Sequence, residues 1–125
     1  MKLRLERGLL FTTVVIENNH QELMLESVLV DTGSAGTIFQ TEQLQRIGIM
    51  YDLEDEMHRI RGVGGTEFVF SKQLERIRVG DLLMTDFQIE VGWMDYGFDI
   101  QGILGLDFLR ATRAVIDLGT LEFRV

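Results

Sequence analysis

Apolar and polar residues alternate along most of this chain with a period of two, which is typical of β-strands that bury one face. Polar or glycine-containing turns divide the alternating stretches, notably Asn18-Asn19-His20-Gln21 and Gly80-Asp81. The pattern predicts strands over residues 8–17, 22–30, 37–39, 56–61, 66–71, 73–79 and 82–91. A last hairpin is expected from residues 114–116 and 121–125.

Two short segments depart from this alternation and are predicted to be helical. Residues 41–47 place Leu44 and Ile47 three positions apart, directly before a glycine that can end a helix. Residues 105–111 are the second candidate. No proline, linker or repeat interrupts the pattern. The sequence therefore predicts a single all-β domain over residues 1–125, with one or two short helices.

The composition excludes several classes of function. The 125 residues contain no cysteine, which excludes disulfides, thiol catalysis and cysteine-bound metals. A formal net charge of −8 argues against nucleic-acid binding. No apolar run is long enough to span a membrane, and the N-terminal residues lack the apolar core of a signal peptide, so the cytoplasm is expected. His20 and His58 show no ligand spacing, so neither a metal nor a cofactor is expected.

The strongest candidate for chemistry is an aspartate at the end of a predicted strand. The run Leu29-Val30-Asp31-Thr32-Gly33-Ser34 places one carboxylate after apolar residues and before small ones. Alone, this run is compatible with an ordinary turn. A second apolar-glycine element, Gly102-Ile103-Leu104-Gly105-Leu106, follows about seventy positions later. An apolar pair between glycines suits a crowded crossing of chain segments, so this element is expected to pack beneath the Asp31 loop.

Together, these two motifs resemble those of the retropepsin-like aspartic peptidases, the single-lobed relatives of pepsin. The resemblance implies a closed β-barrel of the acid-protease type, with Asp31 as a catalytic carboxylate that acts together with Thr32 and Gly33. Hydrolysis of this kind needs two facing carboxylates around one water. The chain contains a single Asp-Thr-Gly, so the second carboxylate must come from a second copy. The sequence thus predicts a homodimer with the active site on its two-fold axis.

The resemblance also implies roles for the neighbours of Asp31. The Thr32 hydroxyl is expected to bond the partner copy, and the Gly33 N–H to donate to the Asp31 carboxylate. The Ser34 hydroxyl is expected to contact the outer oxygen of the aspartate. Ser34 and Ala35 are both expected to lie beside the substrate. Ordinary turn chemistry is the alternative for these positions.

The run Gly62-Val63-Gly64-Gly65 lies between two predicted strands and is the candidate tip of a flap. Glycines at a hairpin tip permit positive φ angles, and retropepsins close such a tip over bound peptide. A mobile hairpin without function is the alternative. One position departs from the retroviral pattern, because Leu106 stands where an arginine is common. Its acidic partner is missing too, since Ala35-Gly36 follow Ser34, so no unpaired charge is left behind.

The function expected from the sequence is an aspartic endopeptidase that hydrolyses peptides or proteins as a homodimer. Apolar residues alternate with polar ones near both termini, and in retroviral members the termini interleave across the dimer. Two alternatives stay open. One is a catalytically silent dimerisation or peptide-binding module of the same fold, and the other is an acidic β-barrel unrelated to peptidases.

Overall fold

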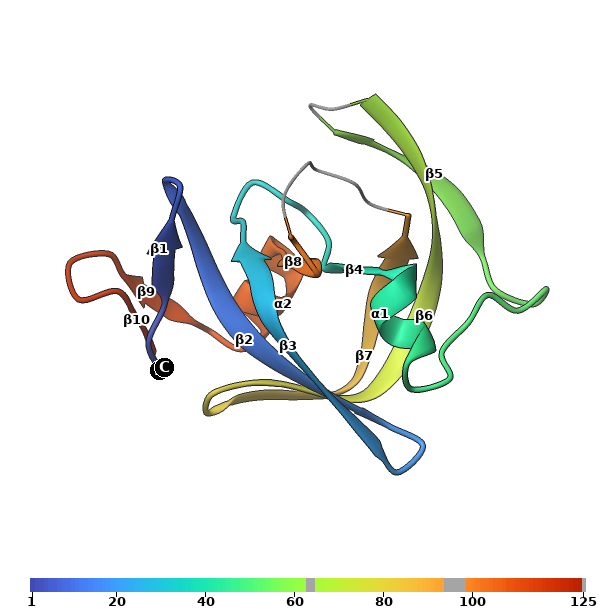
Figure 1. Cartoon of the computed structure of the whole chain (residues 1–125), viewed down its shortest axis with the longest axis horizontal. Coiled ribbons are helices and arrows are strands. Elements are labelled where there is room, and N and C mark those ends of the chain that lie inside the picture. The colour runs from blue at the N-terminus through green and yellow to red at the C-terminus, as the bar shows by residue number, and fades with distance from the viewer. Residues whose placement is uncertain (63–64, 94–98, 125) are drawn as a thin grey trace.

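The alternating segments form strands over most of the chain (Figure 1). The computed structural model describes residues 1–62, 65–93 and 99–124. The strands are β1 (Arg4–Glu6), β2 (Leu9–Asn18), β3 (Gln21–Val30), β4 (Ile38–Gln40), β5 (Met57–Gly62), β6 (Gly65–Val79), β7 (Leu82–Gly92), β8 (Gly102–Leu104), β9 (Val115–Asp117) and β10 (Glu122–Arg124). The helices are α1 (Thr41–Gln45) and α2 (Leu106–Ala111). The all-β class with short helices is therefore confirmed.

Most predicted strands are present within a few residues, with one clear difference. The segments expected at 66–71 and 73–79 form a single strand, β6, which continues without a break through Lys72. The polar stretch remains in the strand because its backbone pairs with β7 and the Lys72 ammonium lies 2.7 Å from the Asp55 carboxylate. The helix expected at residues 41–47 ends two residues earlier.

The order of the strands brings two distant parts of the chain side by side within the sheet. The eight-stranded sheet has the order β1-β2-β3-β8-β4-β7-β6-β5, and β2 also pairs with β6. A ring of pairings therefore connects six strands, in the order β2, β3, β8, β4, β7 and β6. The pairing of β3 with β8 is parallel and sets Val30 opposite Leu104. Consequently, the residues that follow these two strands leave the sheet side by side.

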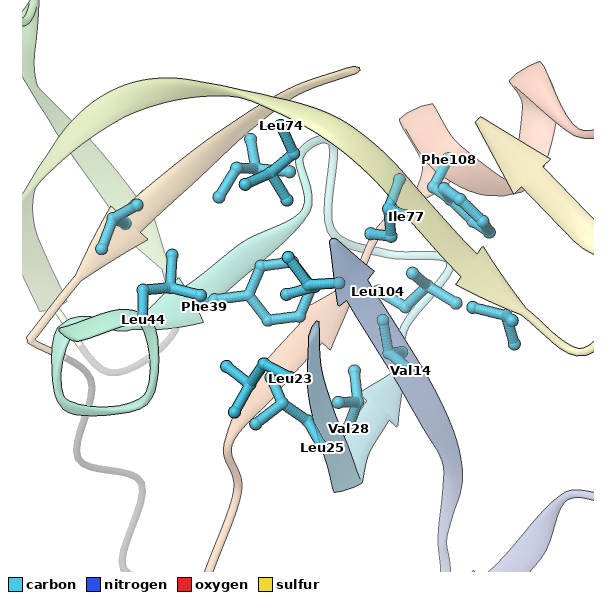
Figure 2. Packing of buried hydrophobic residues seen from close by; sticks show 14 of the residues in the cluster. Val14, Leu23, Leu25, Val28, Phe39, Leu44, Leu74, Ile77, Leu104 and Phe108 are labelled. Carbon is cyan, nitrogen blue, oxygen red and sulfur yellow. The ribbon is translucent and has the colours of Figure 1, made fainter. Parts of the chain in front are cut away.

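Two apolar clusters lie on opposite faces of the central strands. Figure 2 shows part of the larger cluster, whose fully buried members include Val14, Leu25, Phe39, Leu104 and Phe108. The smaller cluster consists of Phe11, Ile38, Ile100 and Ile103. Because successive strand residues point to opposite faces, the neighbours Ile103 and Leu104 enter different clusters. Leu29 and Ile60 pack against the smaller cluster, which thus connects the strand before Asp31 with β5.

The two ends of the chain are hydrogen-bonded to each other (Figure 1). The Leu3 N–H donates to the Leu121 carbonyl over 2.8 Å, and the Phe123 N–H donates to the Met1 carbonyl over 2.8 Å. The other edge of β10 pairs with β9. This differs from the expectation that the terminal segments interleave with those of a second copy, because both edges of β10 are occupied within one chain.

Candidate active site

Asp31 is held at the point where β3 leaves the sheet. Its N–H donates to the Leu104 carbonyl over 3.0 Å, which continues the parallel pairing of β3 with β8 by one residue. The half-buried Leu29 and Val30 precede it on β3. The strand therefore fixes the backbone of Asp31, while its carboxylate lies in the loop that leads to β4, partly exposed to solvent.

The loop after Asp31 turns its own backbone donors toward this aspartate. The Gly33 N–H donates to Asp31 Oδ1 over 2.9 Å, and the Ser34 N–H donates to the Asp31 carbonyl over 3.2 Å. A Cβ at Gly33 would lie 3.2 Å from the same Oδ1, closer than most side chains tolerate. The contact predicted for Gly33 is present, and one carboxylate oxygen of Asp31 is oriented by it.

Ser34 differs from its expected role. Its hydroxyl donates to the Gly36 carbonyl over 2.8 Å, so its single proton stabilises the loop and is not directed at Asp31. The expected contact with the outer oxygen of Asp31 was wrong, because the one hydroxyl proton is donated to the Gly36 carbonyl. Thr32 and Ala35 are exposed. The described part of the chain offers no hydrogen bond to the Thr32 hydroxyl, and the roles of Thr32 and Ala35 stay predictions.

The second motif packs against the Asp31 loop, as the sequence predicted. The Leu106 N–H donates to the Ser34 carbonyl over 2.7 Å. A Cβ at Gly105 would lie 2.5 Å from the Gly36 carbonyl carbon and 2.9 Å from the Ser34 oxygen, so no side chain fits there. Gly102 is similarly confined, since a Cβ would lie 2.9 Å from the Ile38 carbonyl. Gly105 permits the two loops to touch backbone to backbone, whereas Gly102 permits β8 to lie close to β4.

A buried polar network joins the same two loops, and the sequence reasoning missed it. Thr37 is 0% exposed, and its hydroxyl donates to Asp107 Oδ1 over 2.7 Å. Its N–H donates to Asp107 Oδ2 over 3.3 Å. The Gly105 N–H donates in turn to the Thr37 hydroxyl oxygen over 3.1 Å. Asp107 also accepts the Phe108 N–H over 2.8 Å, in the first turn of α2. An acidic residue in the first turn of a helix is the one feature of the sequence that could have pointed to this position.

The flap predicted from the glycine-rich run corresponds to a hairpin of β5 and β6. The two strands pair from Met57 opposite Phe70 to Gly62 opposite Gly65. Figure 1 shows this hairpin extending beyond the rest of the sheet, at the end where the Asp31 loop also lies. Ile60 packs against the cluster of Ile38 and Ile103, which places the hairpin over this part of the molecule. Val63 and Gly64, predicted to form the tip, lie outside the described residues.

The described residues contain no group of histidine, aspartate and glutamate side chains arranged to hold a metal ion. Among these residues, no helix is long and apolar enough to cross a membrane.

Comparison with known proteins agrees with this geometry. The sequence model of a family described as "gag-polyprotein putative aspartyl protease" matches residues 14–111. EIAV protease, solved in complex with the inhibitor HBY-793, is 27% identical, with a TM-score of 0.61 over 86% of this chain and 90% of that one. A retropepsin-like aspartic protease from Rickettsia conorii shares the fold at 21% identity, with a TM-score of 0.62 over 92% of this chain and 82% of that one. No curated protein matches. With the family match covering both loops of the site, the chain belongs to the retropepsin-like family of aspartic proteases.

Proposed function

We propose that the chain is an aspartic endopeptidase that acts as a homodimer and hydrolyses peptide bonds with a water held between two Asp31 carboxylates. The observation that carries the proposal is the Asp31 loop itself. The loop at Gly105 packs against the loop that follows Asp31, and the Gly33 N–H orients one carboxylate oxygen of Asp31. The chain has only one Asp-Thr-Gly, so a pair of such carboxylates requires two copies.

The mechanism follows from two carboxyl groups that face each other across the two-fold axis. Like charges at short range cannot both ionise readily, so the pair holds one proton, as in aspartic proteases generally. The ionised Asp31 takes a proton from the water as the water attacks the peptide carbonyl. The protonated Asp31 of the other copy donates to the carbonyl oxygen. As the tetrahedral intermediate collapses, the Asp31 that took the water proton gives it to the leaving amine, while the other Asp31, now ionised, takes a proton from a hydroxyl of the intermediate.

The remaining site residues hold the carboxylates and the peptide. Exposed Thr32 is suited to bond the partner copy and keep the two aspartates in register. The hairpin that carries Gly62 and Gly65 closes over an extended peptide and binds its backbone, with Val63 and Gly64 at its tip and Ser34 and Ala35 beneath. Because β10 is paired on both edges, it has no free edge to pair with a strand of the second copy. Exposed apolar residues on β1 and around β9, namely Leu5, Val115 and Leu118, are candidates for the contact between the copies.

The first test is digestion of a mixed peptide library by the wild type and by Asp31→Asn, from acid to neutral pH, with the products identified by mass spectrometry. Cleavage by the wild type alone is expected. A folded, dimeric wild type that cleaves nothing would contradict the proposal and favour the silent peptide-binding module. Equal cleavage by both proteins would point to a contaminating protease.

A second test addresses the shared site directly. Asp31→Asn protein is added in increasing excess to a fixed amount of wild type and allowed to exchange copies. In an equal mixture, random exchange leaves about one quarter of the dimers with two intact aspartates. The activity should therefore fall as the inactive copy is added. If activity stays constant while sedimentation shows mixed dimers, each chain works alone and the composite site is wrong.

A further inference from the structure

One face of the flap hairpin and of the adjoining strand β7 carries two glutamates and one histidine. Residues paired across antiparallel strands point to the same side of a sheet. His58 is opposite Val69, Ile60 is opposite Glu67, and Ser71 is opposite Glu90. The inner flap face is defined here by His58, Ile60, Glu67, Ser71, Glu90 and Gly92. Since Ile60 packs on the cluster of Ile38 and Ile103, this face is turned toward the Asp31 loop.

Glu90 lies directly against the loop that follows Asp31. Its N–H donates to the Thr37 carbonyl over 2.9 Å, and its Cγ would be 3.9 Å from a Cβ at Gly36. Its Oε2 lies 2.9 Å from His58 Nε2 and accepts the Ser71 hydroxyl over 3.1 Å. The Glu90 side chain is 19% exposed, and these two partners hold it on the inner flap face.

Glu67 provides the second carboxyl group and is less well satisfied. Its Oε1 is buried and has no hydrogen-bond partner among the described residues. A Cβ at Gly92 would lie 2.6 Å from this oxygen, so the carboxyl group occupies space that only a glycine leaves free. Burial raises the pKa of the Glu67 carboxyl. A buried acceptor without a donor is unfavourable, and a donor from a bound peptide would satisfy it.

The cations near this face leave the Glu67 carboxyl group without a charged partner among the described residues. His58 is the only basic side chain that the described part of the face presents, and Glu90 already engages it. Arg59 alternates to the other side of β5, where its guanidinium lies 5.2 Å from the centre of the Phe68 ring. The face therefore has an excess of acceptors over donors.

We propose that the inner flap face is a subsite for a basic side chain of the bound peptide, with Glu67 and Glu90 as its acceptors. The inference rests on the proposed function, because an extended peptide beneath the hairpin is what delivers the side chain. An arginine suits the subsite because its guanidinium donates to two carboxyl groups at once, while its aliphatic stem packs on Ile60. An acidic side chain at the same position is repelled.

The test is a set of extended peptides in which a single arginine is moved through every position, each paired with a peptide that carries citrulline there. Citrulline nearly keeps the shape of arginine but lacks its charge and replaces one NH2 donor group with an acceptor oxygen. The wild type should prefer arginine at one position by about tenfold or more in kcat/KM, the scale of one charge-assisted hydrogen bond. Glu67→Gln and Glu90→Gln should each reduce that preference several-fold. Glu22→Gln is the matched control, because Glu22 is exposed at the far end of β3, about 30 Å from Asp31.

Binding of the same peptides to the Asp31→Asn protein, followed by fluorescence polarisation, separates the subsite from the catalysis. Arginine preference that both glutamine variants weaken, in cleavage or in binding, supports the subsite. Cleavage without arginine preference, or a preference that neither variant changes, overturns the subsite and leaves the peptidase intact. Binding with arginine preference but no cleavage by the wild type overturns the peptidase and leaves the subsite. Absence of both overturns the two proposals together.

Discussion

Asp107→Ala removes the carboxylate that connects α2 to the loop between Asp31 and β4. Asp107 accepts the hydroxyl and the N–H of Thr37 and also the N–H of Phe108. Thr37 is 0% exposed, so water has no direct access to the donors that lose their acceptor. The substitution should therefore destabilise the fold and loosen the loop that holds Asp31.

The magnitude follows from the donors left behind. Each buried donor without an acceptor costs about 1–3 kcal/mol, and Thr37 contributes two, although its hydroxyl is free to turn toward another oxygen. We expect a loss of about 3 kcal/mol in the free energy of unfolding and a fall in Tm of about 10–20 °C. Asp107→Asn keeps one carbonyl oxygen as an acceptor and should lose about half as much.

Urea unfolding at one fixed chain concentration measures the effect, because dimerisation makes the apparent stability depend on concentration. Asp81→Ala, in the exposed turn between β6 and β7, is the control and should change the free energy by less than about 0.5 kcal/mol. If Asp107→Ala loses less than about 1 kcal/mol, then Thr37 finds other acceptors and the network does not carry the stability assigned to it.

Three further results are expected. Gly105→Ala should abolish peptidase activity and lower Tm, because its Cβ would lie 2.9 Å from the Ser34 oxygen and closer still to Gly36; full activity in a folded variant would show that the two loops can separate without harm. Glu67→Gln should stabilise the protein relative to the wild type, and the difference should grow as the pH rises above 4.5. The reason is that the pKa of Glu67 is raised only in the folded state, so its ionisation costs free energy only there. A constant difference from pH 4 to pH 8 would contradict this. The hydrogen bond from the Thr120 N–H and, to a smaller extent, the one from Arg124 lower the pKa of Asp117. Asp117 therefore stabilises the fold above its usual pKa, and this stabilisation is lost as the pH falls. Asp117→Asn should be less sensitive to acid than the wild type in thermal unfolding, and equal sensitivity would speak against the contribution.

The parts of the fold that the sequence predicted are those determined locally. Alternation within β2 and β3 and the small residues after Asp31 depend on near neighbours, so strands and the Gly33 contact followed from the pattern. The bond between Thr37 and Asp107 joins residues far apart in the chain, and no local pattern marks such a pair. The Ser34 contact was expected from the resemblance, and it was wrong because the hydroxyl donates to the Gly36 carbonyl within its own loop.

The parallel pairing of β3 with β8 also determines when during folding the Asp31 site can exist. Hairpins such as β2–β3 close over a few residues, whereas Val28 must find Gly102 across most of the chain. Closing so long a loop is entropically costly and slow. The Asp31 loop therefore lacks its contacts with Leu104 and Gly105 until β8 has paired with β3. A nascent chain that has been synthesised only as far as β7 already contains its Asp-Thr-Gly, yet it lacks the segment that packs against the Asp31 loop.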